Sequence, residues 1–349
     1  MAQLSYQQPD GLRPLKPFVL WRPALSRLRP VAQSSGCPPY PACLFAHLPP
    51  VCLFAQLFLS VAAASFSPRP TSFLLLLVAF AFASSAMASN ADRVDILARS
   101  AGFSFSRATG EGGVTGCLFV VKNIGDNSQA ALKYFPPGTR STGITEVANR
   151  EKLPDHMNLI KFISCADGGE SKDDGCQDYA IIMELGKCTL SAFSEKKRIL
   201  LSEEETRYIA AALLSALRLV EQKNAMHADL QAKNVVMMPN GAVKIIDYDN
   251  LQQPRTSNWD VTSLARVLCH VYTGKEELSL LNQRHELLKR GPSAAFVAFI
   301  VFLHSCHSLL GDLAQTPFKW IFDAGYDISN PVLCHHAPSS LLDKLNQIP

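Results

Sequence analysis

A predicted hairpin between two stretches that carry aspartate constrains this chain more than any other part of its sequence. Residues 227–234 read HADLQAKN, and residues 244–249 read KIIDYD. The segment between them runs from Val-Val-Met-Met through Pro-Asn-Gly into Val-Lys-Ile-Ile. Asn-Gly supplies the positive φ that a short hairpin needs, so the pattern predicts strand, tight turn and strand. Such a hairpin returns Asp247 to the side of Asn234, close to Asp229.

These three side chains are the set that phosphoryl transfer to an alcohol requires. One carboxylate accepts or orients the hydroxyl, while an amide oxygen and a second carboxylate hold Mg²⁺ on the phosphates. Asp229 is the candidate base, and Asn234 and Asp247 are the candidate metal ligands. The alternative is a chance acidic cluster on a surface loop, which the hairpin spacing disfavours.

Charge is distributed unevenly along the 349 residues. Residues 1–90 hold six basic residues and one acid, which leaves 27 basic and 29 acidic residues in 91–349. The second part is therefore close to neutral and lacks the basic surface expected of a nucleic-acid-binding protein. It is long enough for one or two domains with a substantial core.

The segment 1–90 is predicted to be non-globular. No charged residue occurs in 70–91, and 73–83 are eleven apolar residues followed by small ones. This is the layout of a signal peptide or signal anchor, although eleven residues are short for a membrane span of about 20. The alternatives are an acid-poor transit peptide and a gene model extended upstream of a true start at Met87. The protein would associate with a membrane only if 73–89 is a real anchor. A translation start at Met87 would favour the cytoplasm. The sequence alone does not decide the compartment.

The cysteines favour reduced thiols over a disulfide framework. Seven of them lie in 91–349, an odd number without a Cys-x-x-Cys pair. Three fall in segments that we expect to be buried: Cys117, Cys188 and Cys269. Cys165 and Cys176 flank an acidic, Gly-rich loop and are the best placed for a bridge. Metal binding at 304–307 or 334–336 is disfavoured because the spacing matches no standard zinc pattern.

A glycine-rich turn and two predicted strands lie upstream of the hairpin. Residues 110–116 read GEGGVTG and lead into the apolar strand 117–121. Glycines let a backbone approach phosphates and donate N–H groups, although surface hairpins also carry such runs. In the next strand, 130–135, Lys133 is a charge among apolar residues and therefore needs a partner.

Further elements are predicted downstream. Residues 179–186 (YAIIMELG) indicate a buried strand that ends at glycine. The capping box Ser-Glu-Glu-Glu at 202–205 opens a helix through about Gln222, with apolar residues at a near-3.6 period. The apolar stretch 294–303 is short enough to be a core helix rather than a membrane span.

In order and spacing these features resemble the protein kinase-like superfamily over about residues 100–275. The catalytic loop of that family reads H-R-D-L-x-x-x-N and its metal motif D-F-G, where this chain has H-A-D-L-Q-A-K-N and D-Y-D. The resemblance implies a bilobal α+β fold. A small antiparallel β-sheet lobe with one helix, 100–186, would precede a mostly helical lobe, 187–349. It also implies binding of ATP and Mg²⁺.

The resemblance implies roles for residues around the nucleotide. Gly113 and Gly116 match the second and third glycines of the phosphate-covering loop. Met183 would be the gatekeeper, and the backbone near Glu184 and Leu185 would pair with adenine.

The same resemblance makes Lys133 the lysine of V-A-I-K, whose partner is a glutamate on the next helix. That helix is predicted within 141–153, where Glu146 fits the motif and Glu151 is the rival. Residues five positions apart lie about 140° apart around a helix, so only one of them can face Lys133. Asp260 would begin a later helix and brace the catalytic loop.

Several residues depart from the family pattern. Ala228 stands in place of the arginine that pairs with a phosphorylated activation loop. Only ten residues, 250–259, follow before the Asp260 helix, so the activation segment is truncated and lacks A-P-E. Gln231 replaces a lysine that contacts the transferred phosphate, which removes a positive charge. Asp249 replaces the glycine of D-F-G, as in atypical kinases and the aminoglycoside and choline kinase group.

Three functions therefore stay open. The favoured one is an atypical Ser/Thr protein kinase that transfers the γ-phosphate of ATP to a protein hydroxyl. The others are a pseudokinase acting as a scaffold or allosteric partner, and a small-molecule kinase of the aminoglycoside or choline type. We expect a protein substrate, no nucleic acid and no phosphorylation switch of the usual kind.

Overall fold

The computed structural model describes ten stretches of the chain: 91–112, 117–168, 178–196, 199–254, 259–275, 280–306, 308–309, 318–326, 328 and 336–348. The chain divides into two compact units, Met1–Val61 and Ala62–Pro349, and all described residues belong to the second. The predicted non-globular segment 1–90, with its anchor, transit and Met87 alternatives, lies outside the described residues.

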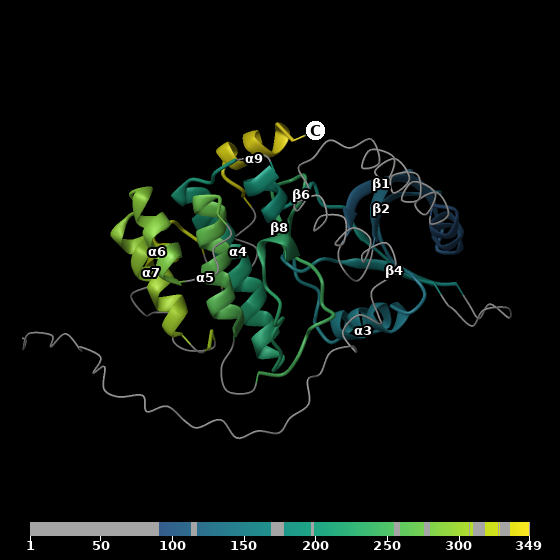
Figure 1. Ribbon diagram of the computed structural model, residues 1–349, viewed down its shortest axis with the longest axis horizontal. Helices are drawn as coiled ribbons and strands as arrows, with labels where there is room; N and C mark the ends of the chain where they lie inside the picture. The colour runs from purple at the N-terminus through teal and green to yellow at the C-terminus, as the bar shows by residue number, and fades with distance from the viewer. Residues whose placement is uncertain are drawn as a thin grey trace, which may run out of the picture. The chain divides into compact units, whose positions relative to one another are not determined.

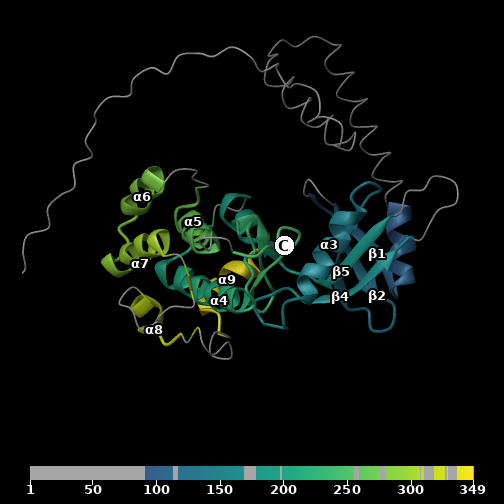
Figure 2. The same cartoon turned by 90° about the horizontal axis from the view of Figure 1, so that it is seen from below.

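A five-stranded antiparallel sheet occupies the first part of the described chain (Figures 1 and 2). Its strands are β1 (Phe103–Gly112), β2 (Cys117–Asn123), β3 (Gln129–Phe135), β4 (Phe162–Asp167) and β5 (Tyr179–Glu184), in the order β1-β2-β3-β5-β4. The helix α3 (Arg140–Glu151) connects β3 to β4 and packs against β3 and β5.

Successive side chains of β3 point to opposite faces of the sheet, so each face of the strand packs against different helices. Ala130, Leu132 and Tyr134 are buried in one cluster, together with residues of the helical segment 91–100. Ala131 and Phe135 belong to the larger core that includes α3's neighbours and the later helices. Lys133 lies between Ala131 and Phe135 on the same face of the strand, so its side chain faces α3.

The later part of the chain is mostly helical. Its helices are α4 (Glu203–Gln222), α5 (Trp259–Thr273), α6 (Leu280–Lys289), α7 (Ala294–Ser305), α8 (Lys319–Phe322) and α9 (Ser339–Asn346). A small sheet of β6 (Cys188–Thr189), β7 (Val235–Met237) and β8 (Val243–Ile245) lies beside them, and a π-helical turn (Ala192–Lys196) and a 3₁₀ turn (Ala232–Asn234) complete the described elements. The predicted α+β fold, sheet first and helices later, is confirmed; the exact lobe boundaries stay predictions.

The predicted hairpin is confirmed as β7 and β8, which pair antiparallel from Val235↔Ile245 to Met237↔Val243. Its turn uses both residues of the Asn-Gly pair. The side-chain oxygen of Asn240 accepts a hydrogen bond from Ala242 N at 3.1 Å, and Gly241 adopts φ +83°. This tight turn therefore sets the pairing register of β7 and β8, and β8 leads the chain back toward Asn234.

The predicted capping box of α4 is also confirmed. Ser202 accepts from Glu205 N at 3.2 Å, and Glu205 accepts from Ser202 N at 2.6 Å. The same carboxylate, fully buried, binds Lys344 of α9 at 2.6 Å. The start of the most buried helix is thus tied to α9, which follows 139 residues later.

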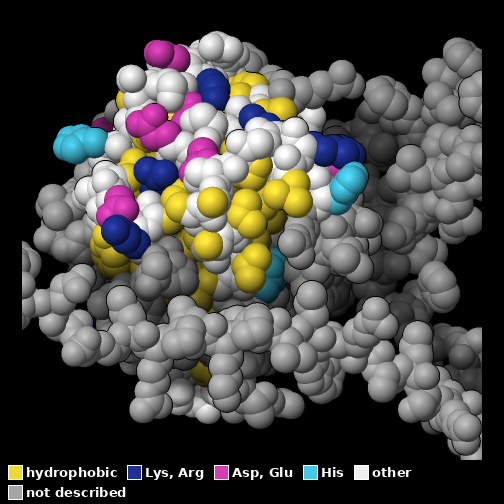
Figure 3. All heavy atoms as spheres, turned by 90° about the vertical axis from the view of Figure 1, so that its left-hand side faces the viewer, with side chains coloured by type: hydrophobic (Ala, Val, Ile, Leu, Met, Phe, Trp, Pro, Cys, Tyr) yellow, Lys and Arg dark blue, Asp and Glu magenta, His cyan; other side chains and the backbone are white. Residues whose placement is uncertain are grey.

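The helix α7 buries Phe296, Phe299, Ile300 and Leu303 in the core, as expected for the apolar stretch. Its outer side keeps Val301 55% exposed. Figure 3, which faces the side where α6 and α7 lie, displays hydrophobic side chains gathered at the centre and charged residues around them. Within the described part of the chain, every helix is too short or too polar to cross a membrane.

The expectation that three cysteines are buried is correct only for Cys269. Cys117 is exposed because it is the first residue of β2, and Cys188 is half-buried in the short strand β6. Cys165 carries a free thiol, and Cys176, the residue best placed to form a bridge with it, lies outside the described residues. The described residues contain no group of three or more His, Cys, Asp or Glu side chains positioned to hold a metal.

Candidate active site

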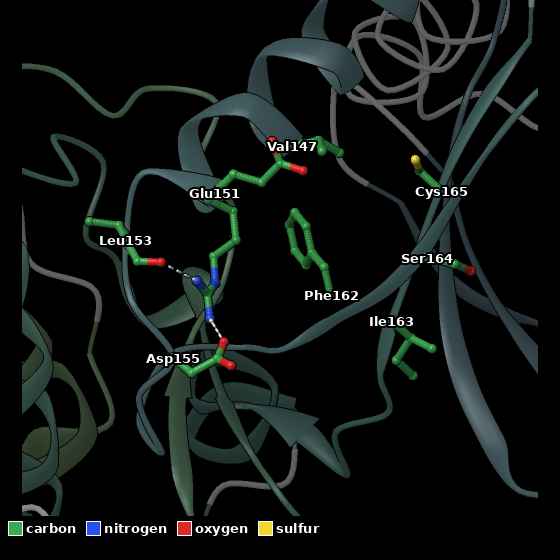
Figure 4. Close-up of a pocket in the computed structure, with 9 residues that line it drawn as sticks. Val147, Glu151, Leu153, Asp155, Phe162, Ile163, Ser164 and Cys165 are labelled. Atoms are coloured by element: carbon green, nitrogen blue, oxygen red, sulfur yellow. Dashed lines mark hydrogen bonds and ion pairs between the residues drawn. The ribbon is translucent and has the colours of Figure 1, made fainter.

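Lys133 lies between two carboxylates. Its Nζ is 2.7 Å from Glu146 Oε2 on α3 and 2.7 Å from Asp247 Oδ1 after β8. Glu146 is 1% exposed, so the structure pairs the lysine with Glu146 and not with Glu151. Glu151 is exposed and lines a surface opening of about 440 Å³ between α3 and β4 (Figure 4).

The electrostatics of this cluster follow from two negative groups around one positive group. Burial raises the pKa of Glu146 to about 7; the Lys133 charge opposes this rise, and the Asp247 charge adds to it. Burial alone would lower the pKa of Lys133, but the two carboxylates together outweigh it and raise that pKa. The raised pKa of Lys133 favours its charged form, and the raised pKa of Glu146 makes this buried carboxyl easier to protonate than an exposed glutamate.

Asp229 and Asn234 lie at the two ends of the loop that precedes β7. The Asn234 amide donates to Asp229 O at 2.8 Å and to Asp229 Oδ2 at 3.0 Å. The Gln231 amide donates to the other oxygen, Asp229 Oδ1. Both carboxylate oxygens of Asp229 thus accept an amide N–H, which orients the group and leaves lone pairs for a further donor.

Asp260, at the start of α5, binds the backbone at the beginning of this loop. Its two buried carboxylate oxygens accept His227 N at 2.6 Å and Ala228 N at 2.9 Å. Ala228 has φ +65°, which is uncommon for a residue with a side chain. The two charge-assisted hydrogen bonds stabilise that backbone conformation. On the other side, His227 Nε2 lies 2.9 Å from Ile246 O.

The hairpin brings the second acidic stretch to the loop. Ile246 N donates to Asn234 O at 3.0 Å, which places Asp247 one residue beyond the contact. Asp247 also has a positive φ, +70°. Strained backbone of this kind is often found at functional sites.

A divalent cation fits the chemistry of these donors. Burial raises the pKa of Asp249, and the negative charges of Asp247 and Asp229 raise it further. The negative charges of Asp247 and Asp229 therefore both act on Asp249, although these three carboxylates do not form a closed metal cage. Mg²⁺ is commonly bound by one or two carboxylates, with waters and phosphate oxygens completing the octahedron, so a full protein cage is not required.

The predicted adenine-binding strand ends against the small sheet. Met183 is 6% exposed and pairs with Ala131 of β3, while the Glu184 carboxylate binds Lys161 N at 2.9 Å and Lys244 Nζ at 2.7 Å. Leu185 is half-buried and packs against the main core. Gly113 and Gly116 lie outside the described residues.

A close approach beside this strand was not predicted from the sequence. A Cβ on Gly186 would lie 2.0 Å from Val236 Cγ2 of β7. The glycine that ends the predicted strand is the signal that indicates it, because a glycine next to a strand often marks close backbone contact.

Two buried polar residues of α3 were also missed: Asn149 is 4% exposed and Arg150 is 6% exposed. They follow Glu146 by three and four positions, which places them on the same helix face. That spacing was available in the sequence once Glu146 was chosen.

This chain belongs to the protein kinase domain family. The family model for the protein kinase domain matches residues 103–285, which is just over half of the chain. The resemblance found in the motifs is therefore confirmed. The matched range contains Lys133, Glu146, the 227–234 loop and Asp247.

Curated relatives agree with this assignment. The serine/threonine-protein kinase pakB of Dictyostelium discoideum is 25% identical over 140 residues, 39% of this chain and 16% of that protein. The probable serine/threonine-protein kinase mkcB of the same organism is 28% identical over 155 residues, 44% of this chain and 20% of that protein. The Wee1-like protein kinase of Arabidopsis thaliana is 29% identical over 133 residues, 38% of this chain and 24% of that protein. The matched part spans a quarter or less of each of these relatives.

Proposed function

We propose that this chain is an ATP- and Mg²⁺-dependent kinase that phosphorylates serine or threonine hydroxyls of a protein. The observation that carries the proposal is the cluster in which Lys133 lies 2.7 Å from both Glu146 and Asp247. It unites β3, α3 and the end of the β7–β8 hairpin. The names of the relatives support a protein rather than a metabolite as the substrate.

The roles follow from the chemistry of each group. Lys133 would bind the phosphates of ATP, and Asn234 and Asp247 would hold Mg²⁺, which neutralises phosphate charge when bound. Asp229 would accept the proton of the substrate hydroxyl. The hydroxyl oxygen then forms the new bond to the γ-phosphorus, the bond from that phosphorus to the β–γ bridging oxygen breaks, and ADP leaves.

Binding of Mg-ATP is the first test. We expect isothermal titration to detect Mg²⁺-dependent ATP binding by the wild type, and Lys133→Ala and Asp247→Ala to weaken it. Lys122→Ala is the matched control, because that lysine is exposed on the neighbouring strand β2. If the wild type binds no ATP in the presence of Mg²⁺, both enzymatic interpretations are excluded.

Transfer of the phosphate is the second test. Radiolabel from γ-labelled ATP should enter a protein mixture, and Asp229→Asn should reduce the rate by about 10²–10⁴-fold, the usual contribution of a general base. ATP binding by that variant should persist. Label that enters a metabolite extract and not the proteins would favour a small-molecule kinase, which Asp249 and the short link to α5 also fit.

A pseudokinase is the second candidate, and one observation favours it. Asp229 already accepts amide N–H groups from Gln231 and Asn234, so a substrate hydroxyl must share an occupied carboxylate. Under this alternative the wild type binds Mg-ATP but transfers no label to protein or metabolite. Gln231→Ala, which frees one carboxylate oxygen, would then leave transfer absent.

A further inference from the structure

We infer that the helical segment 91–100 holds β3 from the face opposite α3 and thereby positions Lys133. The family model begins at residue 103, so this segment lies outside the matched kinase domain. Figures 1 and 2 show the segment, in dark blue, beside β1 and β2. The consequence for ATP rests on the proposed function, whereas the contact of the segment with the sheet does not.

An apolar side of the segment covers the sheet. Val94, Leu97 and Ala98 are almost fully buried, and they occupy positions i, i+3 and i+4 of one helix face. They form one hydrophobic cluster with side chains from all five strands of the sheet. Because the cluster draws on every strand, water is excluded from this face of the sheet only while the helix is in place.

A carboxylate fixes the helix to β1. Asp95 Oδ2 accepts Arg99 Nε at 2.6 Å, and Asp95 Oδ1 accepts Phe105 N at 2.9 Å. The hydrogen bond from Arg99, followed by that from Phe105 N, lowers the pKa of Asp95 and favours its charged form. The contact lies where the pairing of β1 with β2 shifts register, so it gives Phe105 N an acceptor outside the sheet.

A second carboxylate joins the helix to β3. Asp178, one residue before β5, accepts the Tyr134 hydroxyl at 2.8 Å through Oδ1. Arg93 of the helix places Nη1 at 3.4 Å from each oxygen of the same carboxylate. The backbone of Asp178 also accepts Gly168 N at 2.9 Å, beyond the end of β4. One residue therefore binds the helix and the strand that carries Lys133.

Tyr134 is held in one position by its ring and its hydroxyl. Its ring packs edge-on against Phe119 of β2, at a centroid distance of 6.4 Å, and Phe119 packs edge-on against Phe105 of β1, at 6.0 Å. Burial raises the pKa of Tyr134, and the Asp178 carboxylate raises it further, so the hydroxyl keeps its proton and stays a donor.

Lys133 precedes Tyr134 by one residue and faces the other side of the sheet. Consecutive Cα atoms are about 3.8 Å apart across a planar peptide, so a displacement of Tyr134 also displaces Lys133. The two contacts of Lys133 Nζ, with Glu146 and Asp247, are both 2.7 Å long, and hydrogen bonds of this length tolerate only small shifts. The helix therefore acts on the candidate site through the sheet.

Hydrogen exchange in the full chain tests the contact without any nucleotide. In Tyr134→Phe we expect the amides of β3 to exchange about tenfold faster, the factor for one buried hydrogen bond of about 1.4 kcal/mol. Arg93→Met, which changes no residue of the sheet, should accelerate β3 exchange about threefold, because an exposed ion pair contributes less than a buried hydrogen bond. The β7–β8 amides should be unchanged in both variants.

Tyr208→Phe is the matched control for hydrogen exchange. It removes a buried hydroxyl that donates to Gly241 O at 3.1 Å in the later part of the chain, and it should leave β3 exchange as in the wild type. If β3 exchanges as in the wild type in either Tyr134→Phe or Arg93→Met, the inference is overturned, whatever the chain does with ATP.

Nucleotide binding tests the positioning role. In the proposed function Lys133 binds the phosphates of ATP, whereas adenosine has none. Tyr134→Phe and Arg93→Met should therefore raise the Kd for Mg-ATP by about three- to tenfold and leave the Kd for adenosine as in the wild type. Arg93→Lys keeps the charge beside Asp178 and should restore most of the ATP binding. Equal weakening of both ligands would indicate a merely structural role and contradict the inference. A wild type that binds no ATP would refute the proposed function, while the exchange result still decides the contact.

Discussion

Replacing Glu146 with glutamine tests the electrostatics of the Lys133 cluster. The pKa of Glu146 rises from an ordinary value of 4.5 to about 7 in the folded chain, chiefly through burial. Between these values the folded chain holds a proton that the unfolded chain releases. The contribution of this carboxyl to the free energy of unfolding is therefore complete below pH 4.5 and is lost as pH rises to about 7.

The size of the effect follows from the two pKa values. A separation of about 2.5, at about 1.4 kcal/mol per pKa unit, corresponds to about 3.5 kcal/mol. Glutamine does not titrate, so the free energy of unfolding of the wild type should fall by that amount relative to Glu146→Gln between pH 4.5 and pH 7.5. Urea denaturation followed by circular dichroism at a series of pH values measures it.

Glu151→Gln provides the control, because this glutamate is exposed on the same helix. Its curve should run parallel to that of the wild type. If the Glu146→Gln curve is also parallel, the Glu146 carboxyl is not held neutral by burial, and the electrostatic account of the cluster is refuted.

Three further predictions concern single sites. Burial, assisted by two neighbouring cationic side chains, lowers the pKa of His156 to about 4. The contribution of His156 to the free energy of unfolding is therefore present above pH 6.5 and is lost as pH falls toward 4. In His156→Gln, the free energy of unfolding measured by urea denaturation should fall less between these pH values than it does in the wild type. Ala228→Gly should raise the free energy of unfolding by about 1 kcal/mol, because glycine accepts φ +65° without steric cost, and a lower melting temperature would contradict this. Gly186→Ala should destabilise the chain by about 1–3 kcal/mol, because its Cβ would lie 2.0 Å from Val236 Cγ2. The double variant with Val236→Ala should recover most of this loss in thermal unfolding. If it does not, the contact with Val236 is not the cause of the destabilisation.

Local chemistry allowed much of the fold to be predicted. The Asn-Gly turn and the capping box of α4 each depend on residues close in sequence, and each is present. The motif order also led to the kinase domain family, which the family model matches. Burial at strand ends was less predictable, since Cys117 is the first residue of its strand and is exposed.

Polar contacts between residues far apart in the sequence could not be predicted from the sequence pattern. The spacing from Lys133 left Glu146 and Glu151 open, because the choice depends on how α3 rotates against β3 and β5. The contacts of Asn149 and Arg150 with Tyr248 join elements that are far apart in the sequence, and no local rule for helices assigns them. The roles of the site residues stay predictions, while the structure describes the spatial arrangement of those other than Gly113 and Gly116.

The contact between Glu205 and Lys344 has a kinetic consequence. Closing a loop of 139 residues costs conformational entropy that local contacts do not, so we expect the pair to form after α4 and its neighbours have assembled. Contacts that are absent from the transition state change the rate of unfolding more than the rate of folding. Lys344→Met should therefore accelerate unfolding and leave the refolding rate nearly unchanged. The contact of α9 with α4 would then lengthen the lifetime of the folded helical region.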